Sequence, residues 1–264
     1  MKYMVILIAL MLLAVPFTAG CETDVPVDDP VDEPVDDPGD DPVDEPEVET
    51  YSGVSTADRF GYVEVEIDVV NGEIVDARVD EYDGFGFLKD YETYANGGEL
   101  WPYLEESHEA LAEWMVEGDT WDVDIFTEAT GTSEKARSAA KHAMIRAGLE
   151  APVDAEYFDG TFMGISSKGE RDQFGVAWVT IENDEIVDVV LEEAAPDDEG
   201  QYAFKDEDYA AGTGYTEFHE AQEEMPGWFI EAQGPDVDIY TEATTTSELW
   251  MEAVRNALDA ARVN

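Results

Sequence analysis

The chain has 264 residues and a formal net charge of −52, with 65 acidic residues against 13 basic ones. Such a surface repels polyanions, which disfavours nucleic acid and anionic membrane surfaces as partners. Its single cysteine excludes an internal disulfide, so an exported fold would depend on its hydrophobic core.

The first twenty residues are predicted to be a lipoprotein signal peptide. Lys2 supplies a positive charge, and residues 4–17 form an apolar run that is too short to span a bilayer. The small residues 18–20 and Cys21 resemble a bacterial lipobox, which implies a lipidated Cys21, attachment to the lipid bilayer and an extracytoplasmic location. An ordinary signal peptide, cut near Cys21 by coincidence, is the alternative.

Residues 21–50 are predicted to form a disordered tether. Proline recurs at every fourth position from Pro26 to Pro46, and acidic residues fill most of the gaps, which favours an extended chain that buries too little surface to fold. Fourteen acidic residues lie in this segment, so residues 51–264 keep a net charge of −39. This charge favours a halophilic host, because about 1 M salt shortens the Debye length to roughly 3 Å.

The rest of the chain is a tandem repeat. The segment GYVEVEIDVVNGEIVDARVDE (61–81) parallels GVAWVTIENDEIVDVVLEE (175–193). The segment VDIFTEATGTSE (123–134) returns as VDIYTEATTTSE (237–248). Because the duplicated unit is as long as a small domain, we interpret it as a duplicated domain and not as a solenoid repeat.

Shorter matches extend the duplication. SHEA at Ser107 parallels FHEA at Phe218, and the two copies meet near residues 152–156. We therefore predict one domain over residues 51–151 and a second over residues 155–264.

Each copy is predicted to begin with a β-hairpin. Val63, Val65 and Ile67 alternate with acidic residues, as in a half-buried strand, and Asn71-Gly72 offers a tight turn. The second copy repeats the pattern around Asn183-Asp184. Strands followed by helices indicate an α+β fold, with an antiparallel sheet packed by helices.

Two helices are predicted after each hairpin. In the first copy, Leu104, Leu111, Trp114 and Met115 follow helical spacing, and a second helix after the duplicated motif ends near Gly148. The apolar faces of the closing helices are Ala136, Ala139, Ala140, Ala143 and Ala147 in one copy, and Trp250, Val254, Ala257, Leu258 and Ala261 in the other.

The hydroxyl residues of the motif are interpreted first as helix caps. Thr132-Ser133 and Thr246-Ser247 precede a helical pattern, and Thr245 to Glu248 has the spacing of a capping box. Capping does not account for the upstream segments DIFTEAT and DIYTEAT, which are almost identical in the two copies.

The motif resembles that of the FMN-binding domain family, found in the C subunit of sodium-pumping NADH:quinone reductase, the G subunit of Rnf complexes and tandem-domain lipoproteins of extracellular electron transfer. The family motif is Asp, two residues, then Ser/Thr-Gly-Ala-Thr/Ser. A separate flavin transferase esterifies its last hydroxyl with FMN phosphate. The segment Asp159 to Gly164 also resembles the opening of those lipoprotein domains.

Carried over position by position, the resemblance implies four roles in each copy. The FMN acceptors are Thr130 and Thr244, the motif acids Asp124 and Asp238, the first hydroxyls Thr127 and Thr241, and the motif alanines Ala129 and Ala243. Glu128 and Glu242 stand where the family has glycine, and their charge would repel a phosphate. A threonine a few residues ahead of a helix would instead present that phosphate to free backbone N–H groups.

The resemblance implies a lipid-anchored, extracytoplasmic flavoprotein with covalent FMN that relays electrons outward from a quinol-linked membrane donor. Such a protein is an electron carrier more than an enzyme, and a flavin transferase is its maturation partner. The alternative, favoured by Glu128 and Glu242, is a non-redox surface lipoprotein without flavin, acting in ligand binding, adhesion or as the source of a signalling peptide.

No catalytic or metal-binding set is predicted. His108 and His219 lie in the similar segments SHEA and FHEA, but neither has a second nitrogen ligand with which to form a metal site. His142 is expected at the surface. Trp101, Trp114 and Trp228 could stack on a flavin ring, but aromatic residues at helical spacing are more often core residues, which is the expectation here.

Overall fold

The computed structural model describes residues 46–264 except 97, 198, 207 and 210–215. The predicted signal peptide, Cys21 and the tether up to residue 45 lie outside the described residues. Residues 45–264 form one compact unit.

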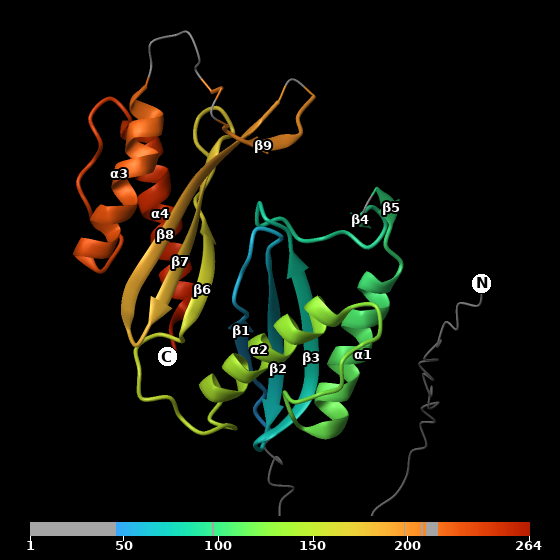
Figure 1. Cartoon of the computed structure of the whole chain (residues 1–264). Helices are drawn as coiled ribbons and strands as arrows, with labels where there is room; N and C mark the ends of the chain where they lie inside the picture. The colour runs from blue at the N-terminus through green and yellow to red at the C-terminus, as the bar shows by residue number, and fades with distance from the viewer. Residues whose placement is uncertain (1–45, 97, 198, 207, 210–215) are drawn as a thin grey trace, which may run out of the picture. The chain divides into compact units, whose positions relative to one another are not determined.

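The first copy is an antiparallel sheet of order β1-β2-β3 with two long helices packed on it (Figure 1). Its main elements are β1 Glu49–Val54, β2 Tyr62–Val70, β3 Glu73–Tyr82, α1 Tyr103–Gly118 and α2 Thr130–Arg146. A short hairpin, β4 Ala95–Asn96 and β5 Glu99–Leu100, precedes α1. Strand β1 begins at Glu49, so the sheet includes the last two residues assigned to the tether.

The second copy repeats this order and adds a fourth strand. Its elements are β6 Gly160–Ile165, β7 Phe174–Glu182, β8 Glu185–Pro196, β9 Tyr202–Phe204, α3 Glu217–Ala232 and α4 Thr244–Ala261. The strands pair antiparallel in the order β6-β7-β8-β9, and α3 and α4 pack on the sheet. The predicted α+β class, with antiparallel sheets packed by helices, is confirmed.

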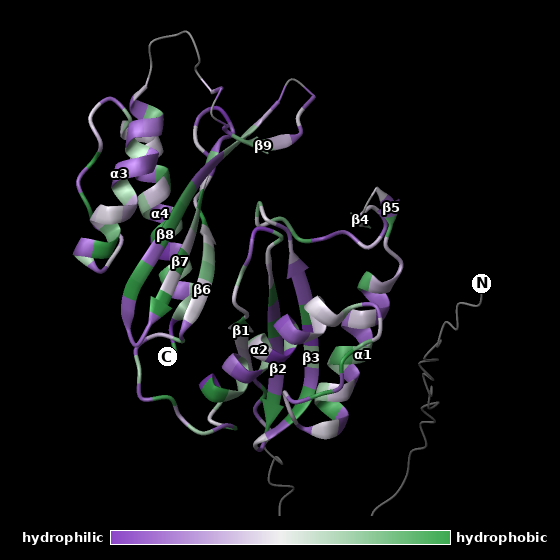
Figure 2. Ribbon diagram, in the orientation of Figure 1, coloured by the Kyte–Doolittle hydropathy of each residue, from purple (hydrophilic) through white to green (hydrophobic). Residues whose placement is uncertain are grey.

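The alternating strand pattern positions the core of the first copy. Val63, Val65, Ile67 and Val69 of β2 are all buried, while the residues between them are half-buried. Asn71 turns the chain with a positive φ of 54°, as the predicted hairpin requires. Hydrophobic residues are denser along β7 and β8 than along β3 (Figure 2).

Strand β7 differs from β2 because both of its faces are buried. One face packs on α4, and the other belongs to a hydrophobic cluster that also contains Ala57 and Phe85 of the first copy. The backbone N–H of Ala57 donates to the carbonyl of Thr161 at 2.7 Å, and Trp178 Nε1 donates to the carbonyl of Asp58 at 3.2 Å. The two copies therefore share a packed interface.

His142 lies in this interface, which corrects its predicted exposure. Its side chain is buried, its ring stacks on Phe158 at 3.8 Å between centroids, and Nδ1 donates to the carbonyl of Val54 at 2.6 Å. Burial lowers the pKa of His142 to about 4. The imidazole is therefore neutral at neutral pH.

Candidate functional site

The predicted acceptor threonines are the first residues of two helices. Thr130 begins α2 and Thr244 begins α4, and both are exposed. Ala129 and Ala243 are the N-cap residues, each only 2% exposed. The threonines had been expected a few residues ahead of the helix; instead they lie in its first turn, where backbone N–H groups lack intrahelical partners and the dipole is positive.

The serines of the motif do not cap these helices, which corrects the capping interpretation. Neither helix has a side-chain hydrogen bond to its cap. The buried Ser133 accepts from the backbone N–H of Phe126 at 3.0 Å and donates to the carbonyl of Ala129 at 2.8 Å. Ser247 makes the matching pair with Tyr240 at 3.1 Å and Ala243 at 2.9 Å. Each serine therefore fixes the loop that leads to the acceptor threonine.

Both glutamates at the family glycine position have a left-handed backbone. Glu128 has φ of 73° and Glu242 has φ of 64°. Glycine adopts this conformation without steric cost, whereas other L-residues are strained in it. The two copies thus keep the backbone conformation that suits a glycine while carrying a glutamate.

The remaining motif residues line the loop surface. Asp124 and Thr127 in the first copy are exposed, as are Asp238 and Thr241 in the second. Their side chains are therefore accessible from solvent.

The surroundings of the motif in the second copy are acidic. A cavity of about 480 Å³ beside Thr241 is lined by Glu217, Glu220, Glu224 and Glu242. The half-buried Trp228 on its wall stacks on Tyr240, with ring centroids 5.7 Å apart and planes at 17°. The aromatic pair offers an apolar surface, but the glutamates would oppose a phosphate on this side.

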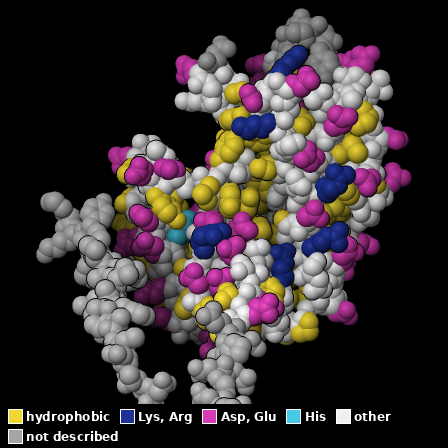
Figure 3. Space-filling model, turned by 180° about the vertical axis from the view of Figure 1, so that it is seen from behind, with side chains coloured by type: hydrophobic (Ala, Val, Ile, Leu, Met, Phe, Trp, Pro, Cys, Tyr) yellow, Lys and Arg dark blue, Asp and Glu magenta, His cyan; other side chains and the backbone are white. Residues whose placement is uncertain are grey.

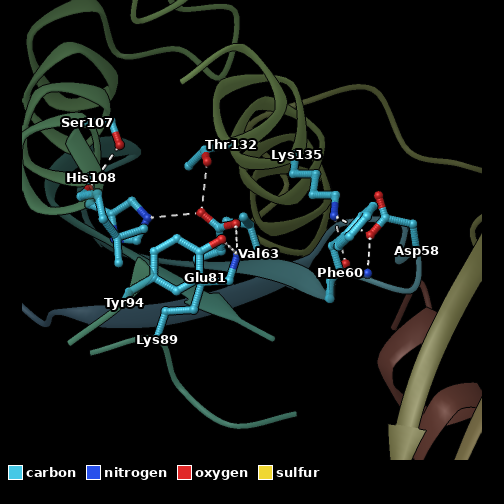
Figure 4. A network of polar contacts seen from close by, with 12 residues as sticks. Asp58, Phe60, Val63, Glu81, Lys89, Tyr94, Ser107, His108, Thr132 and Lys135 are labelled. Atoms are coloured by element: carbon cyan, nitrogen blue, oxygen red, sulfur yellow. Dashed lines mark hydrogen bonds and ion pairs between the residues drawn. The ribbon is translucent and has the colours of Figure 1, made fainter. Parts of the chain in front are cut away.

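A buried carboxylate connects β3 to the start of α2 in the first copy (Figure 4). Glu81 Oε1 pairs with Lys89 Nζ at 2.5 Å, and Oε2 accepts from Thr132 Oγ1 at 2.8 Å with His108 Nε2 at 3.5 Å. Burial raises the pKa of Glu81, but hydrogen bonds from His108, Lys89 and Thr132 and the charge of Lys89 outweigh it and lower the pKa to about 2. Glu81 is therefore a carboxylate at neutral pH.

The corresponding carboxylate in the second copy is incompletely paired. Glu193 is 1% exposed, and one of its oxygens pairs with Lys205 Nζ. The other oxygen, Oε2, has no hydrogen-bond partner among the residues that the structure describes. Leaving a buried polar group unpaired costs about 1–3 kcal/mol.

The two copies also differ in a residue on the facing helix. Helices α1 and α3 both contain 16 residues, so that Trp114 and Trp228 occupy the same position and His108 corresponds to Gln222. This corrects the predicted pairing of His108 with His219. Gln222 Nε2 donates to the carbonyl of Leu191 at 2.8 Å and to Glu192 at 3.1 Å.

Sequence reasoning missed the two buried carboxylates, although a signal was present. Glu81 lies two residues after the buried Val79, and Glu193 two residues after the buried Leu191, so each acid occupies an inward-facing strand position in its copy. An acid on the apolar face of a strand needs a buried partner, and here a lysine farther along the chain, Lys89 or Lys205, provides it.

Comparisons with known proteins do not identify a family. No family model and no curated protein matches the chain. A crystal structure of a Clostridium perfringens protein, solved as a structural genomics target, is similar over 41% of this chain and 97% of its own, with 22% identity and a TM-score of 0.33.

Two further searches cover the described residues only. None of the helices there is long and apolar enough to cross a membrane. The same residues include no group of three or more His, Cys, Asp and Glu side chains placed to hold a metal ion.

Proposed function

We propose that the protein is a lipid-anchored, extracytoplasmic flavoprotein that carries FMN as a phosphoester on Thr130 and Thr244. In this proposal Cys21 holds the protein at the membrane, and FMN receives electrons from a quinol-linked donor and passes them outward. The protein would be a carrier and not an enzyme with its own substrate.

The observation that carries this proposal is the shared geometry of the two acceptor threonines. Each is an exposed first residue of a long helix, and each follows a buried alanine and a residue with left-handed backbone. Left-handed backbone is what the family glycine would provide at that position. The backbone at Glu128 and Glu242 is therefore compatible with the glycine that the family has at this position.

The chain's own groups suit an esterified phosphate. The oxygen of the threonine would form the new P–O bond and lose its proton, while the flavin transferase supplies an activated flavin phosphate and removes its leaving group. First-turn N–H groups and the helix dipole then stabilise the phosphate charge at Thr130 or Thr244. In molar salt, screening would weaken repulsion by the nearby glutamates.

The second candidate is a non-redox surface lipoprotein that keeps the fold without covalent flavin. The four glutamates around the cavity beside Thr241 favour it, because they oppose an anionic ligand on that side of the motif. Ligand binding, adhesion or release of a signalling peptide would then be its function.

Intact mass and ultraviolet fluorescence in denaturing gels distinguish the two. The protein should be coexpressed with a flavin transferase that acts on this family. Thr130→Ala should remove the flavin from the first copy and Thr244→Ala from the second, and the double variant should carry none.

The matched control is Thr245→Ala, which removes an exposed hydroxyl directly after the motif of the second copy and should leave both flavins in place. An unmodified mass for the wild-type protein would exclude covalent FMN and leave the non-redox lipoprotein. A label that persists in the double variant would show that the attachment sites are wrong.

A further inference from the structure

Part of the contact between the two copies is built around one aromatic ring of the second copy. Phe158 is buried and belongs to the core of that copy, and the imidazole of His142 stacks on it with ring centroids 3.8 Å apart and planes at 8°. Nδ1 of His142 donates to the carbonyl of Val54, the last residue of β1, at 2.6 Å. One side chain of α2 therefore connects a strand of its own copy to the core of the other.

Arg146, one turn further along α2, holds a cation against the same ring. Its guanidinium donates to the carbonyl of Ser52 at 2.7 Å and to the carbonyl of Ala260 at 3.1 Å, and its Cζ lies 5.7 Å from the centroid of Phe158. We call His142, Arg146 and Phe158 the α2 joint. In this joint both nitrogen side chains donate to backbone carbonyls, which carry no net charge.

The second copy has an asparagine at the equivalent position of its closing helix. Because α2 and α4 align at their first threonines, His142 corresponds to Asn256. Asn256 Nδ2 donates to the carbonyl of Ile165, the last residue of β6, as His142 Nδ1 does to Val54. Holding the end of the strand therefore does not require an imidazole. The histidine places a titratable ring at the one of these two positions that the other copy covers, since Asn256 is exposed.

A proton added to His142 would meet little compensating charge. Nδ1 already donates, so the proton would enter at Nε2; His108 has Glu81 as its carboxylate partner, whereas His142 has no such partner among the described residues. The charged and titratable groups around the α2 joint are Lys141, Arg146, Glu64, Arg262, Tyr157, Asp154, Asp159 and Asp184. The three aspartates are exposed on the rim of a cavity of about 400 Å³ beside the ring, whereas two cations share the helix of His142.

We propose that the α2 joint is an acid-sensitive contact, in which protonation of His142 weakens the packing of the two copies and lets them move apart. An imidazolium in this position would be buried against Phe158, with the guanidinium of Arg146 one turn away. Each copy has a hydrophobic core of its own, so the contact can open while both cores stay packed.

The direction of the pH dependence follows from burial. Burial lowers the pKa of His142 from 6.5 to about 4, and the charges of Arg146 and Lys141 act in the same direction, against the hydrogen bond to Val54. In the open form the ring is in water and its pKa is the ordinary one, so the open form takes up the proton first. The contribution of His142 to the contact is therefore complete above pH 6.5 and is lost as the pH falls toward 4.

Hydrogen exchange at Ala57 tests this proposal, because its backbone N–H donates across the contact to the carbonyl of Thr161 at 2.7 Å. NMR of the full-length protein would measure exchange at pH 7 and pH 5. Comparison with His142→Asn at each pH removes the intrinsic pH dependence of exchange and the titration of carboxylates. The opening constant of the wild type should rise about twentyfold relative to that of the variant between these two pH values.

The matched control is His219→Asn. His219 is the half-buried histidine of the second copy, bonded through Nε2 to the carbonyl of Tyr209 at 3.1 Å, and it lies outside the α2 joint. This variant should keep the acid response of the wild type.

A titration of the wild-type imidazole by NMR needs no variant and decides the matter if His142→Asn does not fold. It should give His142 a pKa near 4. A pKa near 6.5 would overturn the proposal, as would an equal rise of the opening constant in the wild type and in His142→Asn.

Discussion

Glu128 holds a backbone conformation that disfavours its own side chain. At φ of 73° an L-residue costs roughly 1–2 kcal/mol, which a glycine would not. Glycine loses about 0.5–1 kcal/mol more chain entropy on folding than other residues do. The balance of these two effects favours glycine by a small margin.

We therefore predict that Glu128→Gly stabilises the protein by about 0.5–1 kcal/mol. Urea unfolding at about 1 M salt, where surface charge is screened, would measure the change in midpoint. A glycine in place of an exposed residue with ordinary backbone has the opposite effect.

Glu134→Gly provides that control, because Glu134 is exposed inside helix α2. The same change there should destabilise the protein by about 1 kcal/mol. Equal destabilisation by the two variants would contradict the strain argument. A loss of stability at Glu128 would also show that its side chain contributes more than its conformation costs.

At the scale of elements, the loop before each long helix depends on one buried serine. Ser133 bonds to both ends of the four-residue segment from Phe126 to Ala129. The side chain of Ser133 is fully buried, so both hydrogen bonds tie the loop to the interior of the helix. The serine thus determines where the acceptor threonine lies.

Ser133→Ala should lower the free energy of unfolding by about 1–2 kcal/mol, because it leaves the half-buried N–H group of Phe126 without its acceptor. Chemical denaturation measures the loss, and faster hydrogen exchange at Phe126 would locate it. Ser138→Ala on the same helix is the control and should be neutral or slightly stabilising. Equal effects of the two substitutions would contradict the assigned role.

Periodicity predicted the hairpins and helices because burial along them follows from local spacing. Val63, Val65 and Ile67 are buried as alternation requires, and Leu111 and Met115 as helical spacing requires. The capping prediction was wrong because it considered only the local pattern of hydroxyls, whereas Ser133 bonds to a residue seven positions earlier. The buried Lys89 was missed for a similar reason, since its partner Glu81 lies eight residues earlier, on β3.

At the scale of the whole molecule, the packing of the two copies decides burial that neither copy specifies alone. His142 was expected at the surface because only the first copy has a histidine on its closing helix, but Phe158 of the second copy covers it. Trp178 on the outer face of β7 is buried by the first copy in the same way. A sequence comparison of the copies cannot show which faces meet.

The net charge of −39 over residues 51–264 is the property of the whole molecule with the largest expected effect on stability. Acidic side chains are scattered over the face seen in Figure 3, with fewer basic ones between them. The hairpin even pairs two acids, because Asp68 of β2 lies directly opposite Asp76 of β3. Like charges opposite each other in a sheet are destabilising.

Thermal unfolding should therefore shift to higher temperature as salt rises from low concentration to about 1 M, because screening removes repulsion that exceeds the few attractive surface pairs. Asp76→Asn should raise the low-salt midpoint by roughly 1–4 °C and reduce the salt dependence, since it removes a like-charge pair. The control is Asp188→Asn, at the equivalent exposed position of β8, which faces the uncharged Thr180 and should change the midpoint less. A midpoint that does not change with salt would contradict the halophilic interpretation. Screening by salt would then no longer explain how a phosphate on Thr244 could lie close to the neighbouring glutamates.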